Sequence, residues 1–80
     1  MTKQELLNGQ TFEFDNQEFN EWNGTEDLDA GWIEFSQKLD SFLIFFNGSL
    51  IHSVKTFNAS QKRLDKLFTK WNLEFTQIAE

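Results

Sequence analysis

The sequence contains no cysteine among its 80 residues. Disulfide bonds and metal sites built on thiolates are therefore excluded. A chain without disulfides fits a reducing compartment, and its fold must be stabilised by a packed core alone.

Long hydrophobic runs are also missing. The longest unbroken run, residues 42–46, is five residues long, whereas a membrane-spanning helix needs about 20. The first nine residues, MTKQELLNG, contain no hydrophobic stretch of signal-peptide length. We therefore expect a cytoplasmic protein without a membrane partner.

Residues suited to catalysis are scarce. His52 is the only histidine, so neither a multi-histidine metal site nor a pair of histidine acids and bases can be built. No G-x-S-x-G nucleophile motif occurs, and the four glycines stand at separate apparent turns instead of forming a phosphate-binding loop. The sequence predicts a non-enzymatic protein with no metal and no cofactor.

Aromatic residues are abundant. The chain has ten Phe and three Trp, against one Val and four Ile. Each buried Phe or Trp removes about 150–250 Å² from water, so a few rings can form the core of a small protein. Because 80 residues are too few for two self-supporting cores, the sequence predicts a single domain.

The first residues predict a short helix. Thr2 and Glu5 form the S/T-x-x-E pattern of a capping box, and Asn8-Gly9 is a signal that ends a helix. A helix over residues 2–7 is too short to be stable alone, so it must pack against the rest of the domain.

Two alternating segments in the N-terminal half predict half-buried strands. They are residues 10–15, with Phe12 and Phe14 on one face and Glu13 and Asp15 on the other, and residues 32–37, with Ile33 and Phe35 on one face and Trp32, Glu34 and Ser36 on the other. Residues 16–22 fit either a returning strand, which we favour, or one helical turn. Residues 23–31 are expected to form an acidic loop.

Asn47-Gly48 is the strongest hairpin signal in the chain, because a two-residue type I′ turn needs positive φ at both positions. It predicts strands over residues 42–46 and 49–57, with Phe46 opposite Ser49. The predicted faces carry Phe42, Ile44, Phe46 and Ile51 on one side, and Leu43, Phe45, Leu50 and Val54 on the other, with His52 opposite Leu43. Both faces are therefore hydrophobic near the turn.

The C-terminal residues predict a long amphipathic helix, with Asn58 as its N-cap and Gln61 at the third helical position. Its hydrophobic face consists of Leu64, Leu67, Phe68, Trp71, Phe75 and Ile78. Leu73 departs from this stripe, so we expect the helix to stop near Asn72. Residues 73–78 fit a tail, a short strand or a continuation of the helix. The predicted fold class is α+β, a small antiparallel β-meander of three or four strands with the C-terminal helix packed across it.

Charge is distributed unevenly along the chain. Residues 1–40 carry ten acidic and two basic residues, a balance of −8, whereas residues 41–80 carry three acidic and five basic residues, a balance of +2. Eight of the carboxylates lie between Glu13 and Glu34, with no basic residue among them. Such segregation bears on the partners of a protein more than on its fold.

The acidic segment predicts a surface that binds a basic protein. Aromatic side chains anchor protein interfaces while charge steers the encounter, and Trp22 and Trp32 flank the acidic loop. The candidate partner-binding residues are Glu18, Glu21, Trp22, Glu26, Asp27, Asp29 and Glu34. Small acidic inhibitors of phage or mobile-element type occupy nucleic-acid-binding grooves in this way, and that class analogy is one form of the hypothesis. The competing interpretation is a solvated acidic surface that keeps the domain soluble.

Two further hypotheses use other parts of the chain. Lys55, Lys62, Arg63, Lys66 and Lys70 would place positive charge on and beside the C-terminal helix, which suits an accessory protein that binds nucleic acid. The net charge of −6 opposes binding to a polyanion. Alternatively, the acidic half and the basic helix face could pair between copies of the chain, which would make it a self-assembling subunit. A monomer or a small homo-oligomer is expected.

Overall fold

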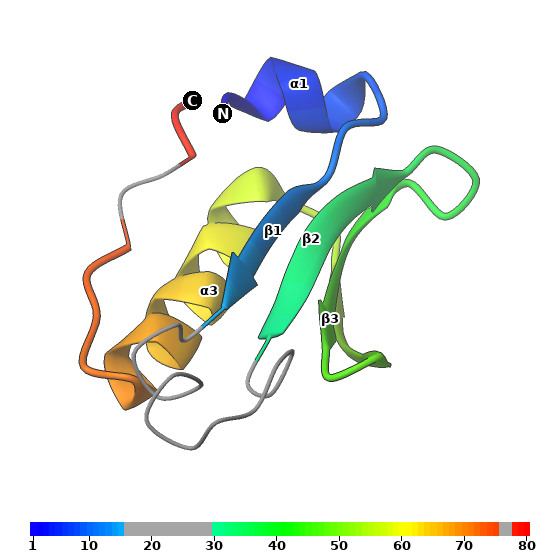
Figure 1. Ribbon diagram of the computed structural model, residues 1–80. Coiled ribbons are helices and arrows are strands. Elements are labelled where there is room, and N and C mark those ends of the chain that lie inside the picture. The colour runs from blue at the N-terminus through cyan, green and yellow to red at the C-terminus, as the bar shows by residue number, and fades with distance from the viewer. Residues whose placement is uncertain (16–29, 76–77) are drawn as a thin grey trace.

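The computed structural model describes residues 1–15, 30–75 and 78–80. The elements are, in chain order, α1 (Lys3–Leu7), β1 (Phe12–Asp15), β2 (Ala30–Ser36), β3 (Ser41–Phe46), β4 (Ser49–Val54) and α3 (Phe57–Lys70). The four strands form one antiparallel sheet in the order β1-β2-β3-β4, and α3 packs against β3 and β4 (Figure 1). The predicted α+β meander with a C-terminal helix is confirmed.

The alternation of β1 and β2 follows the sequence. Phe14 and Ile33 are buried on the side of the sheet that α3 covers, and Glu13 lies opposite Trp32 on the other side. Directly opposed residues of neighbouring strands share a face, so the register fixes both faces of the sheet. The preference for a returning strand over residues 16–22 falls outside the described residues.

The hairpin turn forms as predicted, with φ of 50° at Asn47 and 83° at Gly48. Next to the turn Phe46 lies opposite Ser49 and Phe45 opposite Leu50, as expected. A register shift then occurs between Ile44 and Phe45. This is a β-bulge, in which one strand contains an extra residue without a partner.

The bulge corrects the predicted faces beyond it. His52 lies opposite Ile44, and Val54 lies opposite Phe42. The prediction that Val54 shares the face opposite Ile44 is therefore wrong, and Ile51, which was predicted on the Ile44 face, is the extra residue without a partner. Val54 packs against the core, whereas Ile51 is 40% exposed. His52, predicted opposite Leu43, instead lies on the side of α3. Strict alternation cannot reveal a bulge, because an inserted residue reverses the face of every residue after it.

The start of α3 also differs from the prediction. Thr56 is the N-cap, with extended backbone and with its hydroxyl Oγ1 accepting a hydrogen bond from the Ala59 N–H at 3.1 Å. Asn58 was predicted in this role and is instead the second residue of the helix. Starting two residues earlier allows Phe57 to enter the core as the first helical residue.

The end of α3 lies where the interrupted stripe predicts it. The helix ends at Lys70, and Asn72 adopts the left-handed conformation with φ of 60°. The Leu73 N–H donates to the Phe68 carbonyl at 2.9 Å, and the Asn72 N–H donates to the Thr69 carbonyl at 3.0 Å. This pair of bonds is the Schellman motif, which satisfies the last carbonyls of a helix.

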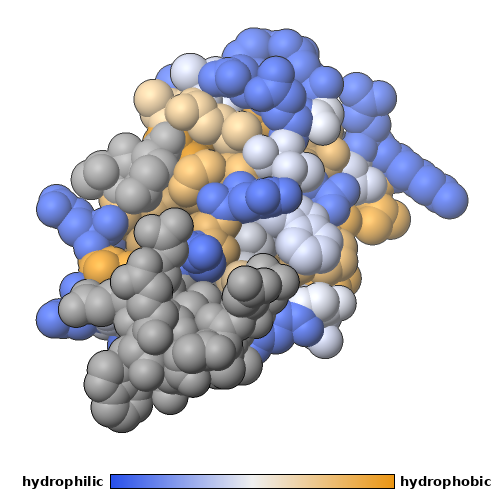
Figure 2. All heavy atoms as spheres, viewed as in Figure 1, coloured by the Kyte–Doolittle hydropathy of each residue, from blue (hydrophilic) through white to orange (hydrophobic). Residues whose placement is uncertain are grey.

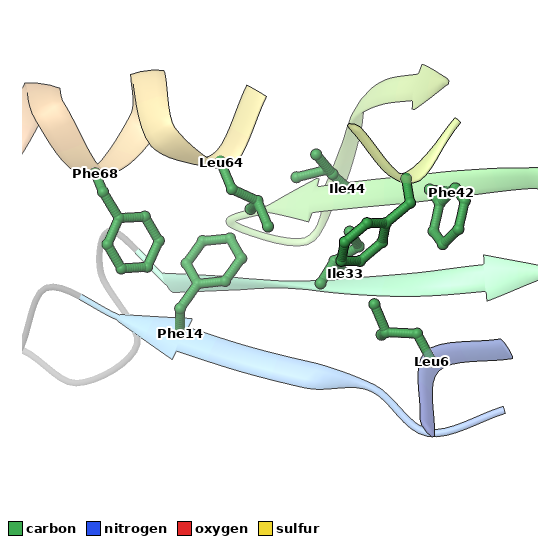
Figure 3. Packing of buried hydrophobic residues seen from close by; sticks show 8 residues of the cluster. Leu6, Phe14, Ile33, Phe42, Ile44, Leu64 and Phe68 are labelled. Atoms are coloured by element: carbon green, nitrogen blue, oxygen red, sulfur yellow. The ribbon is translucent and has the colours of Figure 1, made fainter. Parts of the chain in front are cut away.

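The core lies between α3, the sheet and α1. Figure 3 shows Leu64 and Phe68 of α3 pointing toward Phe14, Ile33 and Ile44 of the sheet. Its buried members are Leu6, Phe14, Ile33, Phe42, Ile44, Phe57, Leu64 and Phe68. Phe75 and Ile78 lie beyond the helix yet pack against this cluster, so the predicted stripe remains part of the core after the helix has ended.

Gly31 of β2 lies close against the backbone of β3. A Cβ atom built on it would overlap the backbone oxygen of Phe45 and would stand 3.0 Å from the Phe14 ring. No side chain fits there, so glycine is required by the space and not by its backbone angles.

The two ends of the described chain meet beside α1 (Figure 1). The Lys3 N–H donates to the Ala79 carbonyl at 2.7 Å, and the Ala79 N–H donates to the Met1 carbonyl at 3.0 Å. Thr2 and Ala79 thereby form a parallel bridge. Among the described residues, no helix has the length and apolar character needed to cross a membrane.

Candidate interaction surface

The face of the sheet opposite α3 carries a row of side chains that crosses all four strands. The register places Glu13 of β1 opposite Trp32 of β2, Trp32 opposite Phe45 of β3, and Phe45 opposite Leu50 of β4. Glu13 is exposed, Trp32 and Phe45 are half-buried, and Leu50 is 51% exposed. The row therefore begins with a carboxylate and continues as an accessible hydrophobic strip.

Trp32 is held in place by two contacts. Its indole stacks on the Phe45 ring, with the ring centroids 4.5 Å apart and the planes 9° from parallel. Its Nε1–H donates to the Glu34 carboxylate Oε1 at 2.8 Å. Stacking fixes the plane of the indole and the hydrogen bond fixes its rotation, so the ring is preorganised on the surface.

Glu34 begins a second row on the same face. It lies opposite Leu43, which lies opposite Ser53. Leu43 is only 8% exposed, so the accessible hydrophobic area on this face comes from the first row. We call the set Glu13, Trp32, Glu34, Phe45 and Leu50 the acidic–aromatic face.

No positive charge belongs to this face in the described part of the chain. None of the four strands contains Lys or Arg, and the Glu13 carboxylate makes no hydrogen bond or ion pair with another described residue. Within residues 1–15, 30–75 and 78–80, the one ion pair joins Lys3 and Glu80 at 3.9 Å. The Glu13 carboxylate is therefore available to a partner, and the Glu34 carboxylate keeps one oxygen that the Trp32 indole does not use. Figure 2, viewed as Figure 1 with β1 and β2 in front, shows pale and orange surface between hydrophilic patches.

The structure places one of the seven predicted partner-binding residues, Glu34. The other six, Glu18, Glu21, Trp22, Glu26, Asp27 and Asp29, lie outside the described residues. Four members of the acidic–aromatic face, Glu13, Trp32, Phe45 and Leu50, were missing from the predicted set. The alternation of β1 and β2 and the hairpin turn each indicate some of these residues, but the pairing of the strands is needed to bring them together.

The predicted basic residues form a second surface on α3. The face that α3 turns inward consists of Phe57, Ser60, Leu64 and Phe68. Lys62, Arg63, Lys66 and Lys70 are all exposed and fall on the opposite side of the helix. Lys55 is exposed and donates from Nζ to the Leu39 carbonyl at 2.8 Å. We call Lys62, Arg63, Lys66 and Lys70 the cationic face.

His52 lies between the sheet and this helix. Burial lowers its pKa below the ordinary 6.5, and the positive charges of Arg63 and then Lys66 lower it further. In the described part of the chain, no Ser, Asp or Glu side chain is hydrogen-bonded to His52, and no cluster of His, Cys, Asp and Glu has the arrangement of a metal site.

The two charged surfaces lie on opposite sides of a two-layer fold. The acidic–aromatic face belongs to the side of the sheet that α3 leaves uncovered, and the cationic face belongs to the outer side of α3. Glu13 and Glu34 thus lie on one side of the fold, and the four cations of α3 lie on the other.

Comparisons of the chain with protein-family models, with curated proteins and with solved structures found no match.

Proposed function

We propose that the chain is a cytoplasmic, non-enzymatic protein-interaction module that binds a basic protein surface through its acidic half. The observation that carries the proposal is the acidic–aromatic face. Its carboxylates have no basic neighbour on the sheet, and they border a hydrophobic strip that ends at the exposed Leu50.

The chemistry of this face suits a positively charged protein better than it suits plain solubility. A solvated surface needs charge but has no use for an aromatic pair, because exposed hydrophobic area lowers solubility. A protein interface uses both, with aromatic side chains as anchors and complementary charge for steering. The sequence-based hypothesis also assigns partner binding to six carboxylate or indole side chains between positions 18 and 29, which lie outside the described residues. An inhibitor that occupies a basic nucleic-acid-binding groove is one form of this function.

The test reverses charge on the face and compares it with reversal elsewhere. The first variant is Glu13→Lys with Glu34→Lys, and the control is Asp65→Lys with Glu74→Lys, which changes the net charge equally at exposed sites outside the face. A third variant, with Glu26, Asp27 and Asp29 changed to Lys, tests the predicted loop residues.

Partners are captured from the native host, identified by mass spectrometry, purified and titrated by calorimetry against each variant. We expect a basic partner that binds the native chain and the control alike and loses affinity for the other two variants. A partner set and affinities unchanged by both reversals would refute the proposal.

The cationic face supports a second candidate, binding to nucleic acid. Its observation is that four exposed cations share one side of α3, with Asp65 outside that arc of the helix. Four phosphate contacts would give a salt dependence with a slope of about −0.9 per contact on duplex DNA. A gel-shift titration at low salt with generic DNA and RNA separates the candidates. Retardation that disappears when Lys62, Arg63, Lys66 and Lys70 are changed to Gln would favour this function.

A further inference from the structure

The indole of Trp32 has one face that is stacked on a ring of the described residues and one face that is not. Phe45 of β3 covers the first at 4.5 Å. The second faces β1, because β1 and β3 lie on opposite sides of β2 in the sheet. No other ring of the described residues stacks on it, and the neighbour on that side is Glu13.

This arrangement forms a site bounded by an aromatic plane and a carboxylate. Side chains of directly opposed residues have Cβ atoms about 4.5–5.5 Å apart, so a flat group placed against the indole lies within reach of the Glu13 carboxylate. Glu34 stands at the edge of the same ring, and one of its oxygens is already occupied by the indole N–H. Because that N–H is used, Trp32 offers a partner its π surface only.

We propose that the acidic–aromatic face recognises arginine, with a guanidinium of the partner stacked on Trp32 and paired with Glu13. This rests on the proposed function and names the chemistry of the partner. A guanidinium is planar, stacks on aromatic rings and binds a carboxylate through two parallel N–H groups. A lysine ammonium is a compact, strongly hydrated point charge, so it gains less from the flat indole.

The rigidity of Trp32 favours this recognition. The stack on Phe45 and the hydrogen bond to Glu34 hold the ring before a ligand arrives, so binding does not have to order it. Leu50, at the far end of the row, offers the partner a hydrophobic contact beside its arginine. The ligand class is therefore a protein segment with an exposed arginine next to an apolar side chain.

The experiment compares two short peptides that differ only in carrying two arginines or two lysines. Binding is followed on the full ¹⁵N-labelled chain through the indole N–H signal of Trp32 and the backbone amides of β1 and β2. A cation–π contact at an exposed site contributes about 0.5–1 kcal/mol, so we expect the arginine peptide to bind about two- to fivefold more tightly.

Variants assign this preference to the site. Trp32→Leu is expected to equalise the two peptides, and Trp32→Phe, which keeps a ring and guards against loss of folding at this position, should retain part of the preference. Glu13→Gln is expected to weaken both peptides, whereas Asp65→Asn, an equal change of charge on α3, should leave both affinities unchanged.

Equal affinity for the two peptides on this face would overturn the arginine proposal and leave the proposed function standing. A preference that survives Trp32→Leu would likewise overturn it. If neither peptide perturbs β1 and β2, the site does not exist, and the proposed function is then decided by the charge-reversal variants and the captured partner.

Discussion

Replacing Gly31 by Ala gives the sharpest test of how β2 and β3 hold the candidate surface. The new Cβ would overlap the Phe45 carbonyl oxygen, where carbon and oxygen normally stay about 3.3 Å apart or more. The Phe14 ring, 3.0 Å from the added atom, leaves no space for the Cβ to move away from the Phe45 oxygen. The strands β2 and β3 must therefore separate locally, because the Phe45 backbone oxygen cannot change rotamer as a flexible side chain can.

The size of the effect follows from the contacts that this separation weakens. The separation weakens backbone hydrogen bonds of the β2–β3 ladder next to Gly31, such as the one that the Asn47 N–H donates to the Ala30 carbonyl at 2.7 Å, and each such bond contributes about 0.5–1.5 kcal/mol. Their loss amounts to about 1–3 kcal/mol, which is also the usual cost of overpacking a core. For a domain of this size, each 1 kcal/mol lowers Tm by about 4–8 °C.

The assay is urea denaturation followed by tryptophan fluorescence and far-UV circular dichroism, with near-UV dichroism reporting the Trp32–Phe45 stack. The control is Gly9→Ala, which meets no atom within 4 Å but has φ of 98°, so its cost of about 1–2 kcal/mol comes from backbone strain alone and leaves the near-UV signal unchanged. If Gly31→Ala were as stable as the native chain, within about 0.5 kcal/mol, the close approach of β2 and β3 would be refuted.

Two further predictions concern α3 and its neighbour. Thr56→Ala should lower the free energy of unfolding by about 1 kcal/mol because it removes the N-cap. Asn58→Ala should change the free energy of unfolding by less than about 0.5 kcal/mol. The urea midpoints of the two variants test this, and a larger loss of stability in Asn58→Ala than in Thr56→Ala would identify Asn58 as the cap. His52 should titrate below 6.5 in an NMR experiment on its ring protons, and Arg63→Gln should raise its pKa, because the Arg63 charge follows burial as a cause of the shift. The folded chain then binds a proton at His52 less readily than the unfolded chain does. The contribution of His52 to stability is therefore complete above pH 6.5 and is lost as the pH falls from 6.5 to the folded-state pKa. Stability that rises on acidification across that interval, measured relative to the His52→Gln variant, would contradict this prediction.

Local signals in the sequence predict the elements of this fold. The capping box at Thr2 and Glu5 forms with both of its hydrogen bonds, and Asn47-Gly48 turns the hairpin. Each of these depends on a few adjacent residues whose backbone preferences and hydrogen-bonding groups agree. The interrupted stripe at Leu73 predicts the end of α3 for the same reason.

The bulge shows where local signals stop. The sequence of β3 contains no signal at Ile44 and Phe45 that indicates an extra residue opposite them in β4. The bulge places Val54 against the core beneath α3, which is a contact between separate elements that the alternation within one strand does not contain. At the start of α3, Thr56 and Asn58 are both acceptable caps, and the choice depends on burying Phe57.

The acidic–aromatic face needed the same kind of information. Sequence alone gives the charge of Glu34 and the hydrophobic character of Phe45, but it does not say that Trp32 stands between Glu13 and Phe45. That neighbourhood is created by pairing β1 with β2 and β2 with β3. The prediction therefore found the acidic character of the surface and missed its aromatic partner and its hydrophobic end.

The bridge between Thr2 and Ala79 has a consequence for the order of folding. The bridge closes a loop that contains the sheet and α3. Because the entropy cost of closing this loop is smaller once the sheet and α3 have brought the two ends together, we expect the bridge to form after them. The five residues of α1 are too few to persist without this anchor and the burial of Leu6. Amide exchange at Lys3, whose N–H is held by Ala79, therefore reports whether the whole domain has finished assembling, and it would be the first signal lost when the ends come apart.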